Sequence, residues 1–149
     1  PPMITADVPR LQAELAKAPD DGLVLIGRRH LSSNNSWMHN IAPLVRGGNR
    51  CTVQVHPADA ERLGLTDGAL ASVTSRAGKL EVPVEVTEDV RRGVVSIPHG
   101  WGHDVDGARA RVARANPGVN SNLVADETLM DAPSGTSVLN GIPVEVAPA

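Results

Sequence analysis

A segment rich in hydrogen-bond donors follows a short apolar run in the first third of the chain. The apolar run covers residues 23–26 and stops at Gly27, and no carboxylate interrupts residues 27–40. Side chains that carry a donor fill most of this segment, namely Arg28, Arg29, His30, Ser32, Ser33, Asn34, Asn35, Ser36, Trp37, His39 and Asn40. Guanidinium forks and neutral donors suit an anionic, oxygen-rich ligand, above all a phosphate. The alternative is a polar surface loop whose Asn and Ser side chains close local turns.

Two further stretches could take part in binding. The loop His99-Gly100-Trp101-Gly102-His103 follows an apolar run, and its glycines could expose backbone N–H groups to a ligand. A second polar patch covers residues 116–122.

The spacing of His99 and His103 also allows a metal site, but a Gly-Trp-Gly loop does not fix the distance between the two side chains as a helix would. No third nitrogen or sulfur ligand lies nearby, so we predict no metal site.

The composition predicts one β-rich domain. The chain has 149 residues and a mass of 15.6 kDa, which suits a single compact domain. It contains no Phe, no Tyr and 2 Trp, so its core must consist of Val, Leu, Ile and Ala side chains. Its 14 Gly and 12 Pro residues indicate many tight turns.

The charge distribution favours a local anion site. A net charge of −3 and a pI near 5.9 argue against a nucleic-acid-binding protein, which normally has a strong basic excess. The basic residues are nevertheless clustered, as Arg28 with Arg29, Arg46 with Arg50, and Arg109 with Arg111 and Arg114.

A single cysteine limits the redox and metal chemistry of the chain. Cys51 has no partner for an intrachain disulfide, and zinc or iron–sulfur sites made of cysteines alone are excluded. We expect Cys51 to be a small buried residue on a strand.

No apolar stretch is long enough to span a membrane and no signal-peptide core is present, so a cytoplasmic location is expected.

Hydrophobic patterning predicts a β-barrel with short helices. Strands are predicted over residues 23–26, 52–55, 69–75, 80–86, 94–97 and 142–146. Helices are predicted over 10–18, 56–63 and 107–115, after a linker over 1–9, with a turn at 20–22 and mostly loop over 99–136. Pro83 cannot donate to a β-ladder, so its strand should lie at an edge or leave its N–H side free.

Several motifs occur together in one order. They are the strand end Gly27-Arg28, His30 with Asn34, His56-Pro57-x-Asp59-Ala60-x-x-Leu63-Gly64-Leu65-x-x-Gly68, Ser75-Arg76-x-Gly78, Val86-Thr87, Gly93-Val94-Val95, Pro98-His99-Gly100-Trp101 and residues 120–123. From about Leu23 to its end, the chain resembles the C-terminal molybdopterin-dinucleotide-binding domain of the dimethyl sulfoxide reductase family of molybdenum and tungsten oxidoreductases.

The resemblance implies a fold and a role. The expected fold is mainly β, a double-psi β-barrel with short helices and long polar loops over residues 23–149, after a linker and short helix over residues 1–22. Such a domain grips bis(molybdopterin guanine dinucleotide), whose molybdenum or tungsten is ligated outside this chain. The expected partners are the remaining domains of the parent oxidoreductase, and the isolated chain should be inactive, with no catalytic residue of its own.

The resemblance also marks candidate cofactor-binding residues. They are Gly27, Arg28, His30, Ser33, Asn34, Ser36, Trp37, His99, Gly100, Trp101, Asn120 and Asn122. Gly27 would allow close approach of the backbone to the ligand, and Arg28 would fork onto a phosphate. His30 would donate to the cofactor, and Asn120 would read a pterin or guanine edge. Trp37 would either stack on a purine or pterin or belong to the core.

Other assignments remain open at this level. No Gly-x-Gly-x-x-Gly or phosphate-loop motif is present, which excludes the common nucleotide-binding loops. Double-psi barrels also serve as adaptor modules on ATPases, where polar loops contact proteins instead of a pterin. A third possibility is a separate small subunit that supplies this domain to a larger enzyme.

Overall fold

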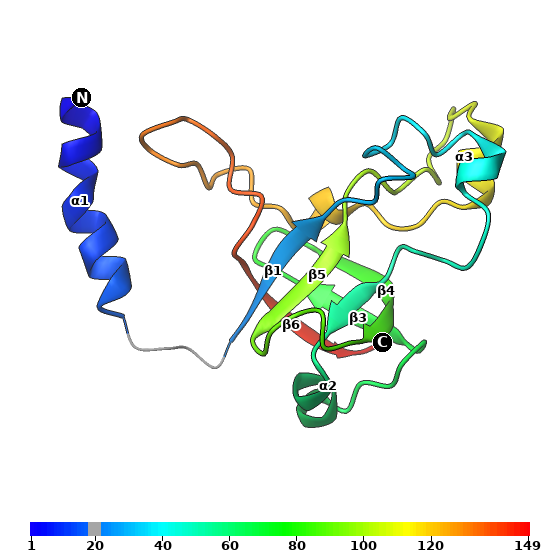
Figure 1. Ribbon diagram of the computed structural model, residues 1–149, viewed down its shortest axis with the longest axis horizontal. Helices are drawn as coiled ribbons and strands as arrows, with labels where there is room; N and C mark the ends of the chain where they lie inside the picture. The colour runs from blue at the N-terminus through cyan, green and yellow to red at the C-terminus, as the bar shows by residue number, and fades with distance from the viewer. Residues whose placement is uncertain (18–21) are drawn as a thin grey trace.

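Six strands close into a barrel in the computed structural model, which describes residues 1–17 and 22–149 (Figure 1). The strands are β1 (Leu23–Arg28), β2 (Val53–Val55), β3 (Leu70–Thr74), β4 (Lys79–Val86), β5 (Val94–Pro98) and β6 (Ile142–Pro148). Their order around the barrel is β1-β5-β2-β4-β3-β6. The β1–β5 and β2–β4 pairs are parallel and the other pairs are antiparallel. The barrel is of the double-psi type, so the predicted fold is confirmed.

The barrel interior is filled by β-branched side chains. Val53, Val73, Val82, Val95 and Ile97 are each fully buried. Alternation along β6 directs every second side chain inward, as expected for a strand with one buried face. Val and Ile pack well on a pleated surface, so a core without Phe or Tyr is sufficient here. The predicted core composition is confirmed.

Pro83 lies on a strand that has neighbours on both sides. It pairs with Leu70 of β3, whereas the ladder from β4 to β2 begins one residue later, at Val84. Because the barrel is closed, β4 is not an edge strand, and the edge-strand alternative for Pro83 is wrong. Pro83 has no backbone N–H to donate, and it lies just before the residues of β4 that pair with β2.

The helices differ from the prediction mainly at their starts. Helix α1 (Pro2–Leu15) includes the residues predicted as a linker, because Pro2 occupies a first-turn position that tolerates proline. Pro9 lies inside this helix, and Leu11 and Leu15 are 49% and 86% exposed. The predicted helix end at residue 18 and the turn residues 20 and 21 lie outside the described residues. Helix α1 stands apart from the barrel (Figure 1).

Helix α2 (Pro57–Leu63) forms as predicted. The Nδ1 atom of His56 accepts a hydrogen bond from the backbone N–H of Ala58 at 3.2 Å, and Gly64 ends the helix in the left-handed conformation. Helix α3 (Arg111–Ala115) is shorter than predicted, because Gly107 has a φ of +81° and cannot belong to a right-handed helix. The 3₁₀ turns η1 (Ala42–Leu44) and η2 (Ser121–Val124) interrupt the loops.

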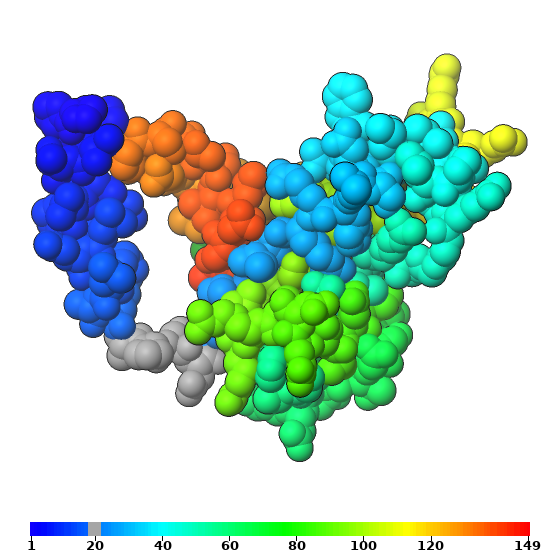
Figure 2. Space-filling view, in the orientation of Figure 1, coloured from blue at the N-terminus to red at the C-terminus, as the bar shows by residue number. Residues whose placement is uncertain are grey.

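The long loops leave one end of the barrel. Parallel pairing puts Arg28 beside Pro98, so the segment of residues 29–52 and the segment of residues 99–141 begin next to each other. In Figure 2 the segment between β1 and β2, coloured blue to cyan, covers the upper end of the molecule, above the green segment that includes β3, β4 and β5. The fold therefore brings the two donor-rich stretches to the same end.

An ion pair between Arg76 and Asp126 supports a testable prediction about stability. Asp126 accepts a hydrogen bond from Nε of Arg76 at 2.6 Å and one from the hydroxyl of Thr128 at 2.6 Å. The Arg76 guanidinium lowers the pKa of Asp126 from 3.8 to about 2. Asp126→Asn should lower the midpoint of thermal unfolding near neutral pH.

The pH dependence of this effect is its control. A depressed carboxyl pKa contributes stability above pH 3.8 that is lost as the pH falls toward about 2. The difference in unfolding midpoint between Asp126→Asn and the unchanged chain should therefore shrink over that interval. A difference that is constant with pH would show that the charge of Asp126 is not the cause.

Candidate functional site

Close contacts between glycines and loop backbone join the two donor-rich stretches. A Cβ on Gly100 would lie 2.3 Å from the carbonyl carbon of Asn35, and one on Gly102 would lie 2.5 Å from Cβ of Asn120. Both glycines have positive φ angles, so other residues would be strained as well as obstructed. The loop of residues 99–103 thus lies between residues 27–40 and residues 116–122 and contacts both.

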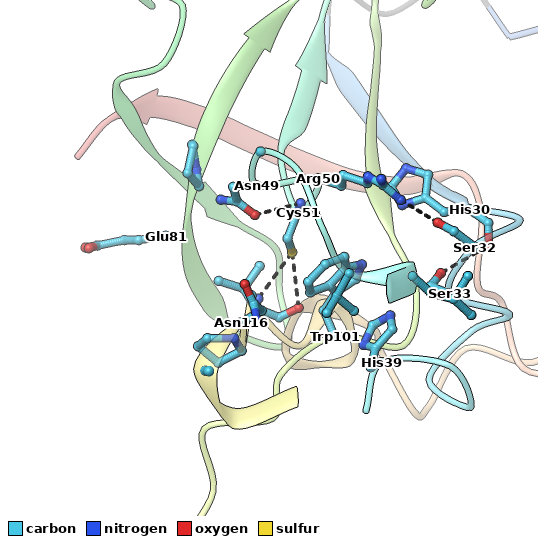
Figure 3. Close-up of a pocket in the computed structure, with 18 of the residues that line it drawn as sticks. His30, Ser32, Ser33, His39, Asn49, Arg50, Cys51, Glu81, Trp101 and Asn116 are labelled. Carbon is cyan, nitrogen blue, oxygen red and sulfur yellow. Dashed lines mark hydrogen bonds between the residues drawn. The ribbon is translucent and has the colours of Figure 1, made fainter. Parts of the chain in front are cut away.

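These loops enclose a cavity of about 430 Å³, which is within the usual range for small-molecule sites (Figure 3). His30, Ser32 and Ser33 lie at one side of it, Trp101 and Cys51 lie toward its centre, and Asn49 and Glu81 lie at the opposite side. The remaining walls come from Leu44, Val45, Gly48, Arg50, Leu70, Pro83 and residues 115–119, with His39 near Trp101. The walls are mixed, with apolar faces and a few polar groups.

Three buried ring nitrogens at this cavity lack a hydrogen-bond partner within the described part of the chain. They are Nδ1 of His30, Nε2 of His39 and Nε1 of Trp101. Burying a polar group without a partner costs about 1–3 kcal/mol, so proteins rarely leave several of them together. Trp101 can only donate. The arrangement fits a bound molecule with acceptor atoms, such as phosphate or carbonyl oxygens.

A pair of histidines connects the two loops behind the cavity. His39 is 1% exposed, its ring centroid lies 4.4 Å from that of Trp101, and its Nδ1 atom contacts Nε2 of His103. Burial lowers the pKa of His39 below its ordinary value of 6.5, and the nearby His103 and His30 lower it further. His39 thus packs against Trp101 and contacts His103, so it joins residues 27–40 to the loop of residues 99–103.

Arg28 does not line the cavity. Its Nη1 atom donates to the carbonyl of Ser96, and its Nη2 atom donates to the carbonyl of Thr52 at 3.0 Å and to the hydroxyl of Thr52 at 2.7 Å. Glu85 lies 3.6 Å from Nη2. Burial lowers the pKa of Arg28, and the Glu85 carboxylate opposes that shift. The guanidinium expected at a phosphate thus contacts protein acceptors, and its contact with a ligand stays a prediction.

Other predicted residues lie outside the cavity. Gly27, His99 and Asn122 line a separate crevice of about 10 Å³, which is too small for an organic ligand. A Cβ on Gly27 would lie 2.0 Å from Nε2 of His99, so in this structure Gly27 allows close approach of a side chain. Asn120 accepts a hydrogen bond from the N–H of Asn122 at 3.1 Å and caps η2.

Three predicted residues of the first loop are exposed, namely Asn34, Ser36 and Trp37. Trp37 is 83% exposed, so the alternative that placed it in the core is wrong. Of the predicted set, His30, Ser33 and Trp101 line the cavity, and Gly100 brings the loops into contact.

The sequence prediction missed several cavity residues. They are Ser32, His39, Asn49, Arg50, Cys51, Glu81 and Asn116. The clustering of Arg46 with Arg50 was a usable signal, since Arg50 donates to the carbonyl of Arg46 at 3.1 Å and to the hydroxyl of Ser32. Cys51 is buried as predicted, but it precedes β2, and its sulfur accepts from the N–H of Val119 at 3.2 Å.

The described residues contain no group of three or more His, Cys, Asp or Glu side chains that could hold a metal ion. Within residues 1–17 and 22–149, no helix has the length and apolar character needed to cross a membrane.

Comparisons with known proteins show which family this chain matches. A family model described as "Molydopterin dinucleotide binding domain" matches residues 23–143. The molybdopterin-containing subunit of arsenate respiratory reductase from Chrysiogenes arsenatis is 35% identical over 80 residues, covering 52% of this chain and 10% of that subunit. The alpha subunit of an F420-dependent formate dehydrogenase from Methanocaldococcus jannaschii is 34% identical over 84 residues, covering 56% of this chain and 11% of that subunit.

A solved structure supports the fold. Acetylene hydratase from Pelobacter acetylenicus superposes with a TM-score of 0.71 at 24% identity, over 97% of this chain and 20% of that one. The chain thus spans about a tenth of the length of the curated relatives it matches. The family match favours the cofactor-binding hypothesis over the adaptor alternative.

Acid should destabilise the protein through His39. Because folding lowers the pKa of His39, the unfolded chain takes up a proton first as the pH falls below 6.5. The free energy of unfolding in urea should therefore decline between about pH 7 and pH 5. His39→Asn keeps an amide near the position of Nδ1 but cannot titrate, so its decline should be shallower. An equally steep decline in the variant would contradict this assignment.

Proposed function

Because this chain belongs to the molybdopterin dinucleotide-binding domain family, we propose that residues 23–149 bind the nucleotide end of that cofactor in the cavity beside Trp101. The observation that carries the proposal is that ring nitrogens of His30, His39 and Trp101, three residues that line a cavity of suitable size, have no partner within residues 1–17 and 22–149. Acceptor oxygens of a ligand would satisfy the Nε1–H donor of Trp101 and either of the two histidine nitrogens that carries a proton.

The proposed cofactor form is bis(molybdopterin guanine dinucleotide). Two ends of the cavity differ in chemistry, and this difference supports a guanine nucleotide. Arg50 and His30 lie at one end and suit the diphosphate. Asn49 lies toward the other end, where its Oδ1 atom accepts from the N–H of Cys51 at 2.9 Å and its amide NH₂ can donate to the carbonyl oxygen of guanine.

The parent protein is proposed to be a two-electron oxidoreductase with molybdenum or tungsten. When bound, the cofactor supplies the redox chemistry at its metal, which other domains of the parent would ligate. This chain's residues bind the nucleotide end and orient it, and they exclude water through the apolar walls formed by Leu44, Val45 and Val119. The remaining domains of the parent are the proposed partners, and residues 1–22 would precede the binding domain as a separate segment.

Guanosine diphosphate is a suitable probe for the site, since it contains the base and the two phosphates. Added to the ¹⁵N-labelled chain, it should shift backbone amide signals of residues 30–33, 48–51 and 115–119. Adenosine diphosphate should shift fewer signals near Asn49, because adenine carries an amino group where guanine has the oxygen that could accept from the Asn49 amide. Shifts confined to residues outside the cavity would refute the placement.

A substitution that fills the cavity should block binding without unfolding the chain. Gly48 lines the cavity, and a Cβ at this position meets no atom within 4 Å, so Gly48→Leu should be accommodated. We expect guanosine diphosphate to bind at least about tenfold more weakly, as measured by titration calorimetry, with little change in the thermal midpoint.

Ala77→Leu is the matched control. Ala77 is exposed on the turn between β3 and β4 and does not line the cavity. Equal weakening by both substitutions, or no weakening by Gly48→Leu, would count against the cavity as the binding site.

A further inference from the structure

The guanidinium of Arg28 is bound to the protein through all three of its nitrogens. Its Nη1 and Nη2 atoms donate to backbone carbonyls of Ser96 and Thr52, and its Nε atom lies 3.4 Å from Nε2 of His30. Nη2 also lies 3.3 Å from the carbonyl of Arg50. To make a bidentate hydrogen bond to a phosphate, Arg28 would have to lose these contacts. The contacts join β1, β5 and the segment before β2.

The contact between Arg28 and His30 determines where His30 carries its proton. A guanidinium has donors and no acceptor and stays protonated in proteins, so Nε of Arg28 must donate. Nε2 of His30 must then accept, which requires it to be unprotonated. In a neutral imidazole the single proton therefore lies on Nδ1. Burial lowers the pKa of His30, and the charges of Arg28 and Arg50 lower it further, so the neutral ring is favoured.

We propose that Arg28 is a positioning residue that holds His30 in the Nδ1–H tautomer, so that His30 offers a hydrogen-bond donor to an acceptor atom of the ligand. The proposal rests on the proposed function for the role of the ligand, but the tautomer is a property of the chain itself. Nδ1 of His30 is one of the three buried ring nitrogens that lack a partner among the described residues, and His30 lines the cavity.

The consequence is selectivity for acceptor atoms at this part of the cavity. Nε1–H of Trp101 is a second unpartnered donor, and it cannot change its role. A ligand oxygen can satisfy either donor, whereas an ammonium or amino group would leave both unpaired. Arg28 would thus act on a bound oxyanion through His30, and Arg50 is the arginine that lines the cavity.

Long-range ¹H–¹⁵N correlation spectra of the unchanged chain near neutral pH test the tautomer directly. We expect an amine-type ¹⁵N shift at Nδ1 of His30 and an imine-type shift at Nε2. Amine-type character at Nε2 would overturn the proposal, because that nitrogen could not accept from Arg28. The result does not depend on whether guanosine diphosphate binds, so a failure of the proposed function and a failure of this inference are distinguishable.

Arg28→Lys tests the role of Arg28. Lysine keeps the positive charge but lacks the planar fork that reaches Ser96, Thr52 and His30 at once. In the variant we expect the fraction of His30 in the Nε2–H tautomer to increase. The ¹⁵N shifts of His56, which lies at the start of α2, should stay unchanged. An unchanged Nδ1–H tautomer in a folded variant would refute the positioning role. Should the variant not fold, the spectrum of the unchanged chain still decides the inference.

Two substitutions of His30 test the donor itself. Asparagine places an amide near the position of Nδ1, and glutamine places one near the position of Nε2. His30→Asn should bind guanosine diphosphate within about threefold of the unchanged chain, and His30→Gln about tenfold more weakly. The reverse order would contradict the assignment of the donor to Nδ1.

Discussion

The parallel pairing of β1 with β5 is the constraint on which the rest of the structure depends. The two strands run in the same direction and end in register, at Arg28 and Pro98, so the loops that follow them start side by side. Because the barrel is closed, no free sheet edge competes for their polar groups. The core is made mostly of strand Val and Ile side chains, with Val124 as a contribution from the loops, so most loop positions can carry polar side chains.

The polar groups at this end form an inner and an outer layer. In the inner layer, Arg28 satisfies backbone carbonyls at the ends of the strands and contacts Glu85. In the outer layer, ring nitrogens of His30 and Trp101 have no partners in the described chain, and the same holds for the buried His39 behind them. A low local dielectric strengthens satisfied hydrogen bonds and penalises unsatisfied ones, so the contacts of Arg28 are favourable and the unpartnered nitrogens are costly unless a ligand pairs with them. This division is what a cofactor-binding domain requires.

Much of the barrel could be predicted because each strand has a local signature. The predicted strands agree with the observed ones within two residues at each end, since alternation and bounding turns depend on neighbours in the chain. The start of α1 was not predicted, since residues 1–9 were expected to form a linker, whereas the helix begins at Pro2 and includes Pro9. The site was predicted as a region. Its individual contacts were not, and Trp37 shows this, since its exposure depends on how a long loop folds.

The sequence by itself determined the strands, the composition of the core, the donor-rich stretches and the family, because these follow from residue types and their spacing. The tertiary structure alone decided which donors remain available to a ligand. Arg28 and Arg50 have the same chemistry, and both donate to protein acceptors, but Arg28 is held by Ser96 and Thr52 away from the cavity, while Arg50 lines it beside Ser32. A hydrogen bond depends on partners that are distant in the chain, and only the closed barrel brings those partners together.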